Sequence, residues 1–211
     1  FERAAAMGRY QGMGMEILTP QQAKDRYPFL ETHDLAGALY DPNDGDIDPA
    51  QVTQALAKGA RDMGAKILRF CPATGVMQTD DGWIVHTDKG DIACDYVVNA
   101  AGYYAQRVGE WFKPYGGRTV PMMVMSHQYL LSEEIPEIEA HSKKTGKKLP
   151  LLRDVDVSYY LRQEKHGFNL GPYEPNCRAH WETDADPMPE DFSFQLWNDD
   201  LDRIEDIVTD A

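Results

Sequence analysis

The chain contains 211 residues, with 35 acidic and 21 basic side chains and a formal net charge of −14 at pH 7. This balance excludes nucleic acid as a partner, because nucleic acid requires a basic face, and it argues against an anionic membrane surface. No run of about 18 apolar residues is present, so the sequence predicts neither a membrane-spanning helix nor a membrane partner.

The cysteines and histidines show no metal-binding or disulfide pattern. Three cysteines lie far apart without a C-x-x-C pair, which is typical of reduced thiols in a bacterial cytoplasm or a mitochondrial matrix. The six histidines lack the spacing of a zinc site. The acidic run 41–48 resembles a calcium loop, but Val52 stands where the glutamate at position twelve belongs. We therefore expect no metal site.

The first clear element is a short helix. Thr19 and Gln22 have the spacing of a capping box, and Pro28 ends the helix that they begin. Residues 35–40 predict a strand, and the polar run 41–46 predicts a turn after it.

A longer amphipathic helix follows that turn. Pro49 begins it and Gly64 has the position of its C-cap. Residues 65–70 predict a strand, so that 49–70 would form half of a βαβ unit. One face of the helix is apolar and consists of Val52, Ala55, Leu56, Ala60 and Met63.

The pattern then changes to the alternation of a small antiparallel meander. Asp80-Asp81-Gly82 and Asp88-Lys89-Gly90 are turn signals between short β-forming runs. The predicted strands cover residues 74–79, 83–87 and 91–94.

A run of small residues follows a buried-strand pattern. Residues 96–99 predict a strand covered on both faces, and 104–112 predict an amphipathic helix. Ala100, Ala101 and Gly102 between them carry little side-chain bulk. In open α/β sheets such a turn receives phosphate-bearing ligands, but a tight crossover without a ligand explains it equally well.

The C-terminal half predicts a second β-rich region in a mixed α/β (α+β) fold. Residues 122–131 predict one long strand, and 156–164 with 168–171 predict a hairpin. The Lys-rich stretch 136–148 predicts a surface excursion. Residues 182–210 hold eleven acidic side chains against Arg203 alone, which is typical of a solvated helix face. Their apolar residues predict a docked helical stripe of Trp197, Leu201, Ile204 and Val208.

Several ordered motifs resemble one family of flavoproteins. The sequences YDPNDGDIDP (40–49), GAKI (64–67), GWIV (82–85) and VVNAAG (97–102) resemble the FAD-dependent D-amino-acid oxidase, glycine oxidase and sarcosine oxidase family. Later motifs resemble its dimethylglycine and sarcosine dehydrogenase branch; they are HQY (127–129), LRD (152–154), YYLRQE (159–164) and GPYE (171–174).

The resemblance implies a cofactor and the backbone that contacts it. In that family the last strand of the FAD domain ends in Asn-Ala-Ala-Gly, whose main chain packs against the ADP half of FAD. The matching residues are Ala100, Ala101 and Gly102, and Ala73 and Thr74 match a backbone contact to the adenine. Both contacts use main chain, so side-chain size matters more than identity.

The resemblance also implies a substrate pocket in the second β-rich region. Tyr129, Tyr159 and Tyr160 would line an amine pocket, and Arg162 would hold a substrate carboxylate. Ordinary cross-strand packing explains the tyrosines equally well. Because adjacent strand residues point to opposite faces, we expect Tyr160 and Arg162 to share one face and Tyr159 to point into the layer beneath. No catalytic residue is assigned.

The resemblance divides the chain into three portions. Residues 1–48 match a substrate-domain portion and connection, 49–118 an FAD-domain portion, and 119–211 a substrate-domain portion with an acidic C-terminal helix. The Gly-x-Gly-x-x-Gly strand and the FAD-linking histidine of the branch are missing. We therefore expect an internal fragment of a longer enzyme, inactive alone and without its own FAD.

The implied activity is hydride transfer from N-methylated glycines, of the dimethylglycine or sarcosine type, to flavin. The partners would be a small amine and an electron acceptor, either oxygen or an electron-transfer flavoprotein. Two alternatives stay open: a related FAD oxidoreductase for another amino or hydroxy acid, and a non-catalytic binding module.

Overall fold

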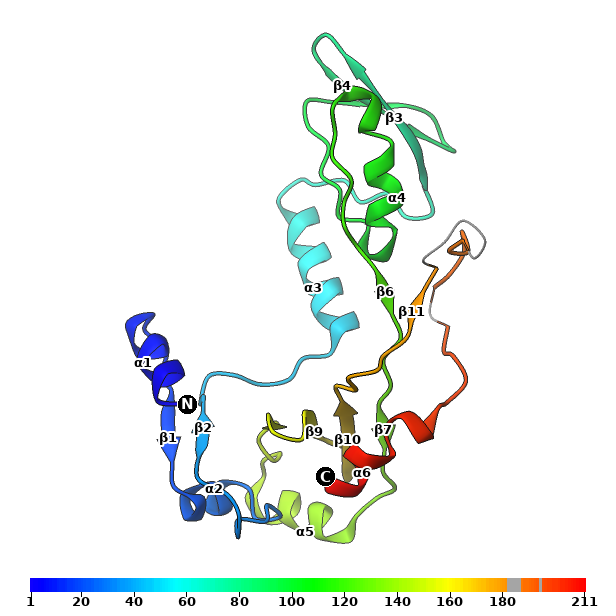
Figure 1. Cartoon of the computed structure of the whole chain (residues 1–211). Helices are drawn as coiled ribbons and strands as arrows, with labels where there is room; N and C mark the ends of the chain where they lie inside the picture. The colour runs from blue at the N-terminus through cyan, green and yellow to red at the C-terminus, as the bar shows by residue number, and fades with distance from the viewer. Residues whose placement is uncertain (182–186, 194) are drawn as a thin grey trace. The chain divides into compact units, whose positions relative to one another are not determined.

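The computed structural model describes residues 1–181, 187–193 and 195–211 (Figure 1). The contacts within the chain divide it into two compact units. Unit 1 comprises residues 1–48, 127–176 and 197–211, and unit 2 comprises residues 49–126 and 177–196. No helix in the described part of the chain is long and apolar enough to cross a membrane.

Unit 1 begins with two helices and a two-stranded sheet. The helices are α1 (Glu2–Tyr10) and α2 (Pro20–Arg26), and β1 (Glu16–Leu18) pairs antiparallel with β2 (Ala38–Tyr40). Thr19 and Gln22 form the predicted capping box, with both reciprocal hydrogen bonds present. The strand expected over 35–40 forms only at its last three residues, where β1 offers a pairing partner.

The main sheet of unit 1 has four antiparallel strands in the order β7-β10-β9-β8. The predicted hairpin is confirmed as β9 and β10, which turn at Lys165 with a φ of 53°. The bounds are β7 Leu130–Leu131, β8 Leu152–Asp154, β9 Tyr159–Glu164 and β10 Gly167–Pro172.

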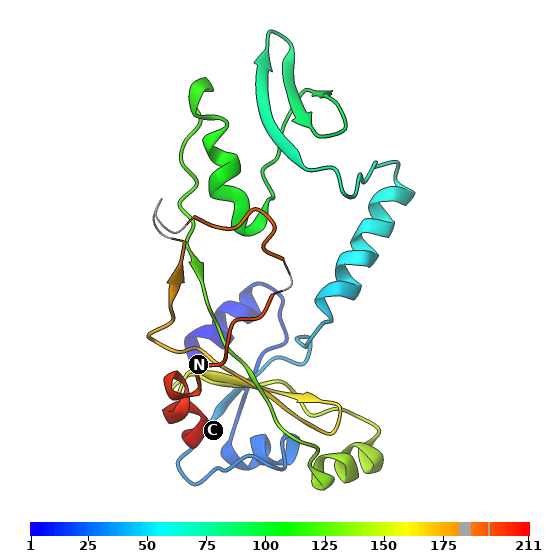
Figure 2. The ribbon, with the colours of Figure 1, turned by 90° about the vertical axis from the view of Figure 1, so that its right-hand side faces the viewer.

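One face of this sheet packs against helices. Leu170 and Tyr159 are buried there, and the ring of Tyr27, just after α2, stacks on Phe168 with centroids 6.5 Å apart. Helices α2 and α5 (Pro136–Thr145) lie on this side (Figures 1 and 2). We call it the apolar face.

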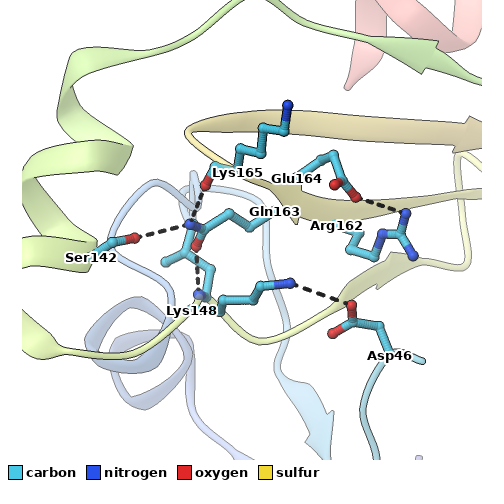
Figure 3. Close-up of polar contacts among 8 residues, drawn as sticks. Asp46, Ser142, Lys148, Arg162, Gln163, Glu164 and Lys165 are labelled. Atoms are coloured by element: carbon cyan, nitrogen blue, oxygen red, sulfur yellow. Dashed lines mark hydrogen bonds and ion pairs between the residues drawn. The ribbon is translucent and has the colours of Figure 1, made fainter. Parts of the chain in front are cut away.

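A buried glutamine fixes α5 to the apolar face. Gln163 Nε2 donates to Ser142 Oγ at 2.9 Å and to the Lys165 carbonyl at 2.8 Å, and its Oε1 accepts from the Leu149 N–H at 2.9 Å (Figure 3). All the polar atoms of this amide therefore have partners, which offsets the cost of burying them.

The surface excursion expected over 136–148 contains a helix, since its first ten residues form α5. Pro136 begins the helix, and Gly146 ends it in the left-handed conformation with a φ of 67°. Ile138 is fully buried, so one apolar side chain docks a helix whose other residues are mostly polar. The polar composition of 136–148 did not indicate a helix, because only one position of α5 is buried in the core.

The C-terminal helical stripe is confirmed only in part. Residues Leu201–Arg203 form a 3₁₀ turn and α6 spans Glu205–Asp210. Ile204 is buried almost completely, whereas Leu201 is exposed, and Trp197 lies outside any helix. The docked contact is therefore shorter than the sequence pattern indicates.

Unit 2 contains the predicted helix and meander. Helix α3 spans Pro49–Asp62, and Gly64 has a φ of 94° at its C-terminal end. The three-stranded sheet has the order β3-β4-β5, formed by Ala73–Thr79, Gly82–Thr87 and Ile92–Cys94. A Cβ at Gly82 would lie 2.6 Å from the Cys94 carbonyl oxygen, so the turn into β4 needs glycine.

Three strands expected in or near unit 2 are wrong. Residues 65–70 and 96–99 are not strands; Tyr96 and Phe70 are exposed, and Phe70 has a φ of 52°. Backbone groups stabilise a strand only when a neighbouring strand pairs with them, and the described residues offer none. Residues 122–131 form two short strands instead of one. Strand β6 (Val124–Met125) pairs with β11 (Ala179–His180), and β7 belongs to the main sheet of unit 1.

The expected helix over 104–112 is a composite. A 3₁₀ turn (Gly102–Tyr104) leads into α4 (Ala105–Glu110), and a second 3₁₀ turn covers Lys113–Tyr115. The hydroxyls of Tyr103 and Tyr104 donate to the Phe192 carbonyl at 2.9 and 3.0 Å. These bonds attach the segment around residue 192 to the start of α4.

Candidate functional site

The second face of the main sheet in unit 1 carries polar and aromatic side chains. Strand residues two apart share a face, and residues paired in register lie side by side. Tyr160 is paired with Arg153 and Gly171, Arg162 with Asn169, and Glu164 with Gly167. We call this surface the polar face and define it by Arg153, Tyr160, Arg162, Glu164 and Asn169.

Two tyrosines form the aromatic part of the polar face. The Tyr160 ring lies across Gly171, where a Cβ would come within 2.0 Å of ring carbons Cε1 and Cζ. Tyr173 meets Tyr160 edge to face with centroids 5.9 Å apart, and its hydroxyl accepts a hydrogen bond from Arg153 Nη1 at 3.0 Å. The missing side chain of Gly171 therefore sets where the Tyr160 ring lies.

Arg162 and Asn169 supply unpaired polar atoms beside those rings. Arg162 Nη2 donates to Glu164 Oε2 at 3.0 Å, as Figure 3 shows, while its buried Nε has no hydrogen-bond partner among the described residues. Asn169 is 7% exposed, and its Oδ1 also lacks a partner in that set. A buried donor and a buried acceptor left unpaired are costly, so each needs a polar partner that the described residues do not supply.

A buried carboxylate lies at the end of the polar face beside Tyr173. The Glu174 side chain is 0% exposed, with one oxygen 3.2 Å from His127 Nδ1 and the other 3.0 Å from Arg203 Nη2. Both distances are those of ion pairs, although neither contact has hydrogen-bond geometry. The His127 ring stacks on Tyr173 with centroids 5.6 Å apart. None of these three residues was among those predicted to bind substrate or cofactor.

The structure separates the four predicted substrate residues. Tyr160 and Arg162 share the polar face, as expected from strand parity, whereas Tyr159 is buried on the apolar face. Burial raises the pKa of the Tyr159 hydroxyl, and the Asp154 carboxylate raises it further. Tyr129 is exposed just before β7. Their roles in binding remain predictions.

The predicted cofactor turn in unit 2 presents open main chain. Asn99 shapes it, since Nδ2 donates to the Ala105 carbonyl at 2.8 Å and Oδ1 accepts from the Ala101 N–H at 3.3 Å. Gly102 has a φ of 58°, and apart from its chain neighbours no atom of the described residues lies within 4 Å of the position a Cβ would take. A flat or phosphate-bearing group can therefore approach this backbone closely, which fits the ADP half of FAD.

Ala73 and Thr74 also present accessible backbone. Both are exposed at the start of β3, where the pairing with β4 shifts register between Ala73 and Gly75. Such a bulge leaves main-chain groups without ladder partners. The arrangement is compatible with a backbone contact to adenine.

The described residues contain no gathering of three or more His, Cys, Asp or Glu side chains that would hold a metal ion. The polar face therefore offers hydrogen bonds, the guanidinium groups of Arg153 and Arg162, and aromatic rings. Such groups bind and orient a small zwitterion; they do not by themselves supply redox chemistry.

Comparison with known proteins identifies the class to which this fold and site belong. Residues 1–209 match the family described as FAD dependent oxidoreductase, and the chain belongs to that family. The mixed fold and the FAD-dependent family expected from the motifs are thereby confirmed.

The relatives include the branch expected from the later motifs. The chain is 38% identical over 195 residues to dimethylglycine dehydrogenase of Mus musculus, covering 90% of this chain and 21% of that protein. It is 35% identical over 204 residues to sarcosine dehydrogenase of Homo sapiens, covering 94% of this chain and 20% of that protein. The chain thus spans about a fifth of the length of these relatives.

A solved structure supports the same fold. L-proline dehydrogenase from P. horikoshii superposes with a TM-score of 0.68 at 27% identity, covering 81% of this chain and 44% of that chain. Similarity therefore extends over both the sequence and the arrangement of elements.

Proposed function

We propose that this chain carries the amine-binding sheet, and part of the FAD-contacting backbone, of a larger dehydrogenase or oxidase for N-methylated glycines. The names of the two relatives support substrates of the dimethylglycine and sarcosine type. Because the chain spans only about a fifth of their length, the activity is proposed for the full-length protein.

The observation that carries the proposal is the pair of unpartnered atoms on the polar face. N-methylated glycines bear a carboxylate and an amine that is cationic when protonated. Arg162 Nε is a charged donor that suits the carboxylate, and Asn169 Oδ1 is an acceptor that suits an N–H. The rings of Tyr160 and Tyr173, which meet edge to face on the same side of the sheet, would supply aromatic surface for a cationic nitrogen.

In this mechanism the chain binds, orients and excludes water. FAD, when bound, supplies the acceptor for the hydride that leaves the N-methyl carbon. Ala100, Ala101 and Gly102, with Ala73 and Thr74, would contact it through main chain. Arg162 and Asn169 would fix the two ends of the substrate, which limits the orientations of the methyl group.

A second candidate is oxidation of a different secondary amino acid. The similarity to an L-proline dehydrogenase favours it, since proline also combines a carboxylate with a secondary amine. The polar face suits both classes of substrate, and they differ in the space that the ring of proline would need beside the tyrosines.

The test is anaerobic reduction of the flavin in the full-length protein. We expect dimethylglycine and sarcosine to bleach the flavin spectrum, and N,N-dimethylethanolamine, which lacks the carboxylate, to fail. Reduction by proline alone would favour the second candidate. Reduction by no amine would overturn the proposal and favour a non-catalytic binding module.

The compartment and the electron acceptor are part of the same proposal. The names of both relatives include the word mitochondrial, which favours a mitochondrion over a bacterial cytoplasm. The polar face is proposed to bind the amine, so it does not distinguish oxygen from an electron-transfer flavoprotein as the electron acceptor. Stopped-flow reoxidation with each acceptor separates them.

A further inference from the structure

The polar face carries two arginines, and only one of them is paired with a carboxylate. Arg162 Nη2 donates to Glu164 Oε2 at 3.0 Å. Arg153 is exposed on the edge strand β8, and no carboxylate in the described part of the chain forms an ion pair with it. Although the chain has a net charge of −14, this face therefore includes a cation whose charge no neighbouring carboxylate offsets.

The register of the sheet brings the two guanidinium groups to either side of one tyrosine. Arg153 is paired with Tyr160 across β8 and β9, and Arg162 is two residues further along β9. Such diagonal positions on one face of a sheet lie about 7–8 Å apart, within reach of long side chains. Two positive charges at that spacing repel each other, and an anion beside Arg153 would offset the repulsion.

A hydrogen bond limits where the Arg153 guanidinium lies. Its Nη1 donates to the Tyr173 hydroxyl at 3.0 Å, and the Tyr173 ring meets Tyr160 edge to face. Among the residues that the structure describes, this is the only hydrogen bond of the Arg153 side chain. A guanidinium has five N–H donors in a planar fork that matches a carboxylate. The remaining donors of Arg153 are therefore available to a ligand beside the tyrosine rings.

We propose that Arg153 is a second carboxylate-binding residue of the polar face, and that the full-length protein therefore binds N-methylated amino acids that carry two carboxylates. The inference rests on the proposed function, in which Arg162 holds the first carboxylate and the tyrosine rings face the amine. Arg153 then contacts a carboxylate on another substituent of the amine. Because dimethylglycine and sarcosine lack that group, Arg153 determines specificity by charge.

A purely structural role for Arg153 predicts a different result. If Arg153 only holds the Tyr173 ring in place, the loss of their hydrogen bond matters and the charge does not. Tyr173→Phe removes the bond and keeps the guanidinium, whereas Arg153→Gln removes the charge and keeps an amide donor. These two variants therefore separate the structural role from carboxylate binding.

The test is calorimetric binding of two amine-free ligands to the full-length protein. Methoxyacetate has one carboxylate, and diglycolate is the same ether with a carboxylate at both ends. Neither contains an amine that could be oxidised during the measurement. We expect diglycolate to bind about fivefold more tightly, the upper end of what a solvent-exposed ion pair contributes. The preference should weaken at high salt, because salt screens exposed charges.

The variants should change this preference selectively. Arg153→Gln should bind diglycolate and methoxyacetate equally, with the Kd of methoxyacetate unchanged. Arg153 is exposed, so this variant should fold. Tyr173→Phe should keep the preference for diglycolate. The matched control is Arg3→Gln on α1, which removes the same charge from another exposed position and should also keep the preference.

Three results would contradict the inference. Equal affinity of the unaltered protein for the two ligands would overturn it and leave the proposed function intact, since methoxyacetate needs only Arg162. Loss of the preference in Tyr173→Phe but not in Arg153→Gln would overturn it in favour of the structural role. Binding of neither ligand would contradict the carboxylate site itself, and with it the proposed function.

Discussion

The polar face of unit 1 and the small-residue turn of unit 2 present ligand-binding groups in different ways. On the polar face, side chains such as Arg162 and Asn169 carry the unpaired atoms. In the turn, Gly102 exposes main chain, and among the described residues beyond its chain neighbours no atom lies within 4 Å of its Cβ position. We therefore expect a substitution on the polar face to change ligand binding through the chemical group that it removes. A substitution in the turn should change ligand binding through the size of the side chain that it adds.

The two units also differ in how they cover their apolar residues. Unit 1 buries Ile138, Ile204 and Tyr159 within its own sheet and helices. In unit 2, Met63 on α3 is 86% exposed and Tyr96 is 87% exposed. These apolar side chains are therefore not buried by other described residues. We expect unit 1 to be the more stable unit in isolation, since burial of apolar surface is the main stabilising contribution.

The largest expected effect concerns FAD itself. The purified 211-residue chain should be colourless, because the Gly-x-Gly-x-x-Gly turn that cradles a pyrophosphate is missing from its sequence. Dialysis followed by an absorption spectrum checks this. A stoichiometric flavin spectrum after dialysis would show that the open turn of unit 2 binds the cofactor alone.

Gly102→Val in the full-length protein should lose most of its flavin. Gly146→Val is a closely matched control, since Gly146 also has a positive φ, 67° against 58°, and equally open surroundings. Backbone strain should then be similar, and only closeness to the cofactor differs. Flavin content per protein measures the difference. Equal losses would mean that the turn has no special role.

Arg162→Gln in the full-length protein should raise the KM for the amine. Loss of a hydrogen bond to a charged group costs about 1.5–3 kcal/mol, or roughly ten- to a hundredfold in KM. Tyr159→Phe, on the apolar face, should act on stability and leave KM nearly constant. The opposite result would place the pocket on the face of Tyr159.

Gly171→Ala tests the position of the Tyr160 ring. The new methyl group would overlap ring atoms at 2.0 Å, so the ring must move. Overpacking of this kind costs about 1–3 kcal/mol of folding stability. Gly45→Ala is the control, because no non-neighbouring atom in the described part of the chain lies within 4 Å of its Cβ position. Denaturant unfolding of both variants should show a loss only for Gly171→Ala.

The smallest effect is expected at alkaline pH. Burial raises the pKa of Tyr27, and the nearby Tyr159 adds to that rise. Because the unfolded phenol loses its proton near pH 10, stability should be unaffected below that pH and should fall above it. Tyr27→Phe should weaken this fall. An unchanged slope of unfolding free energy against pH would show that Tyr27 is not responsible.

Local signals predicted the elements that depend on nearby residues. The capping box at Thr19, the meander β3-β4-β5 and the hairpin β9-β10 all formed as expected. Each is fixed by a cap, a turn or strands adjacent in sequence. The strands expected at 65–70 and 96–99 failed because a strand in a parallel sheet needs neighbours distant in sequence.

In the candidate site, too, local features were predicted from the sequence and contacts between distant segments were not. Strand parity predicted that Tyr160 and Arg162 share a face and that Tyr159 does not, because alternation is a local property of any strand. Asn169 was missed, since its unpaired oxygen becomes visible only when β10 is paired with β9. The group of His127, Glu174 and Arg203 was missed because its members are brought together only by folding.

The sequence by itself determined the family, the hairpin and meander, and the residue types available for binding an amine. Helix caps, turns and the alternation of side chains along a strand depend on residues that are close together in the sequence. The tertiary structure decided which of those residues meet: it buried Glu174 between His127 and Arg203 and divided residues 122–131 between two sheets. The reason is physical, because pairing and burial depend on segments distant in sequence, whose contacts no local pattern specifies.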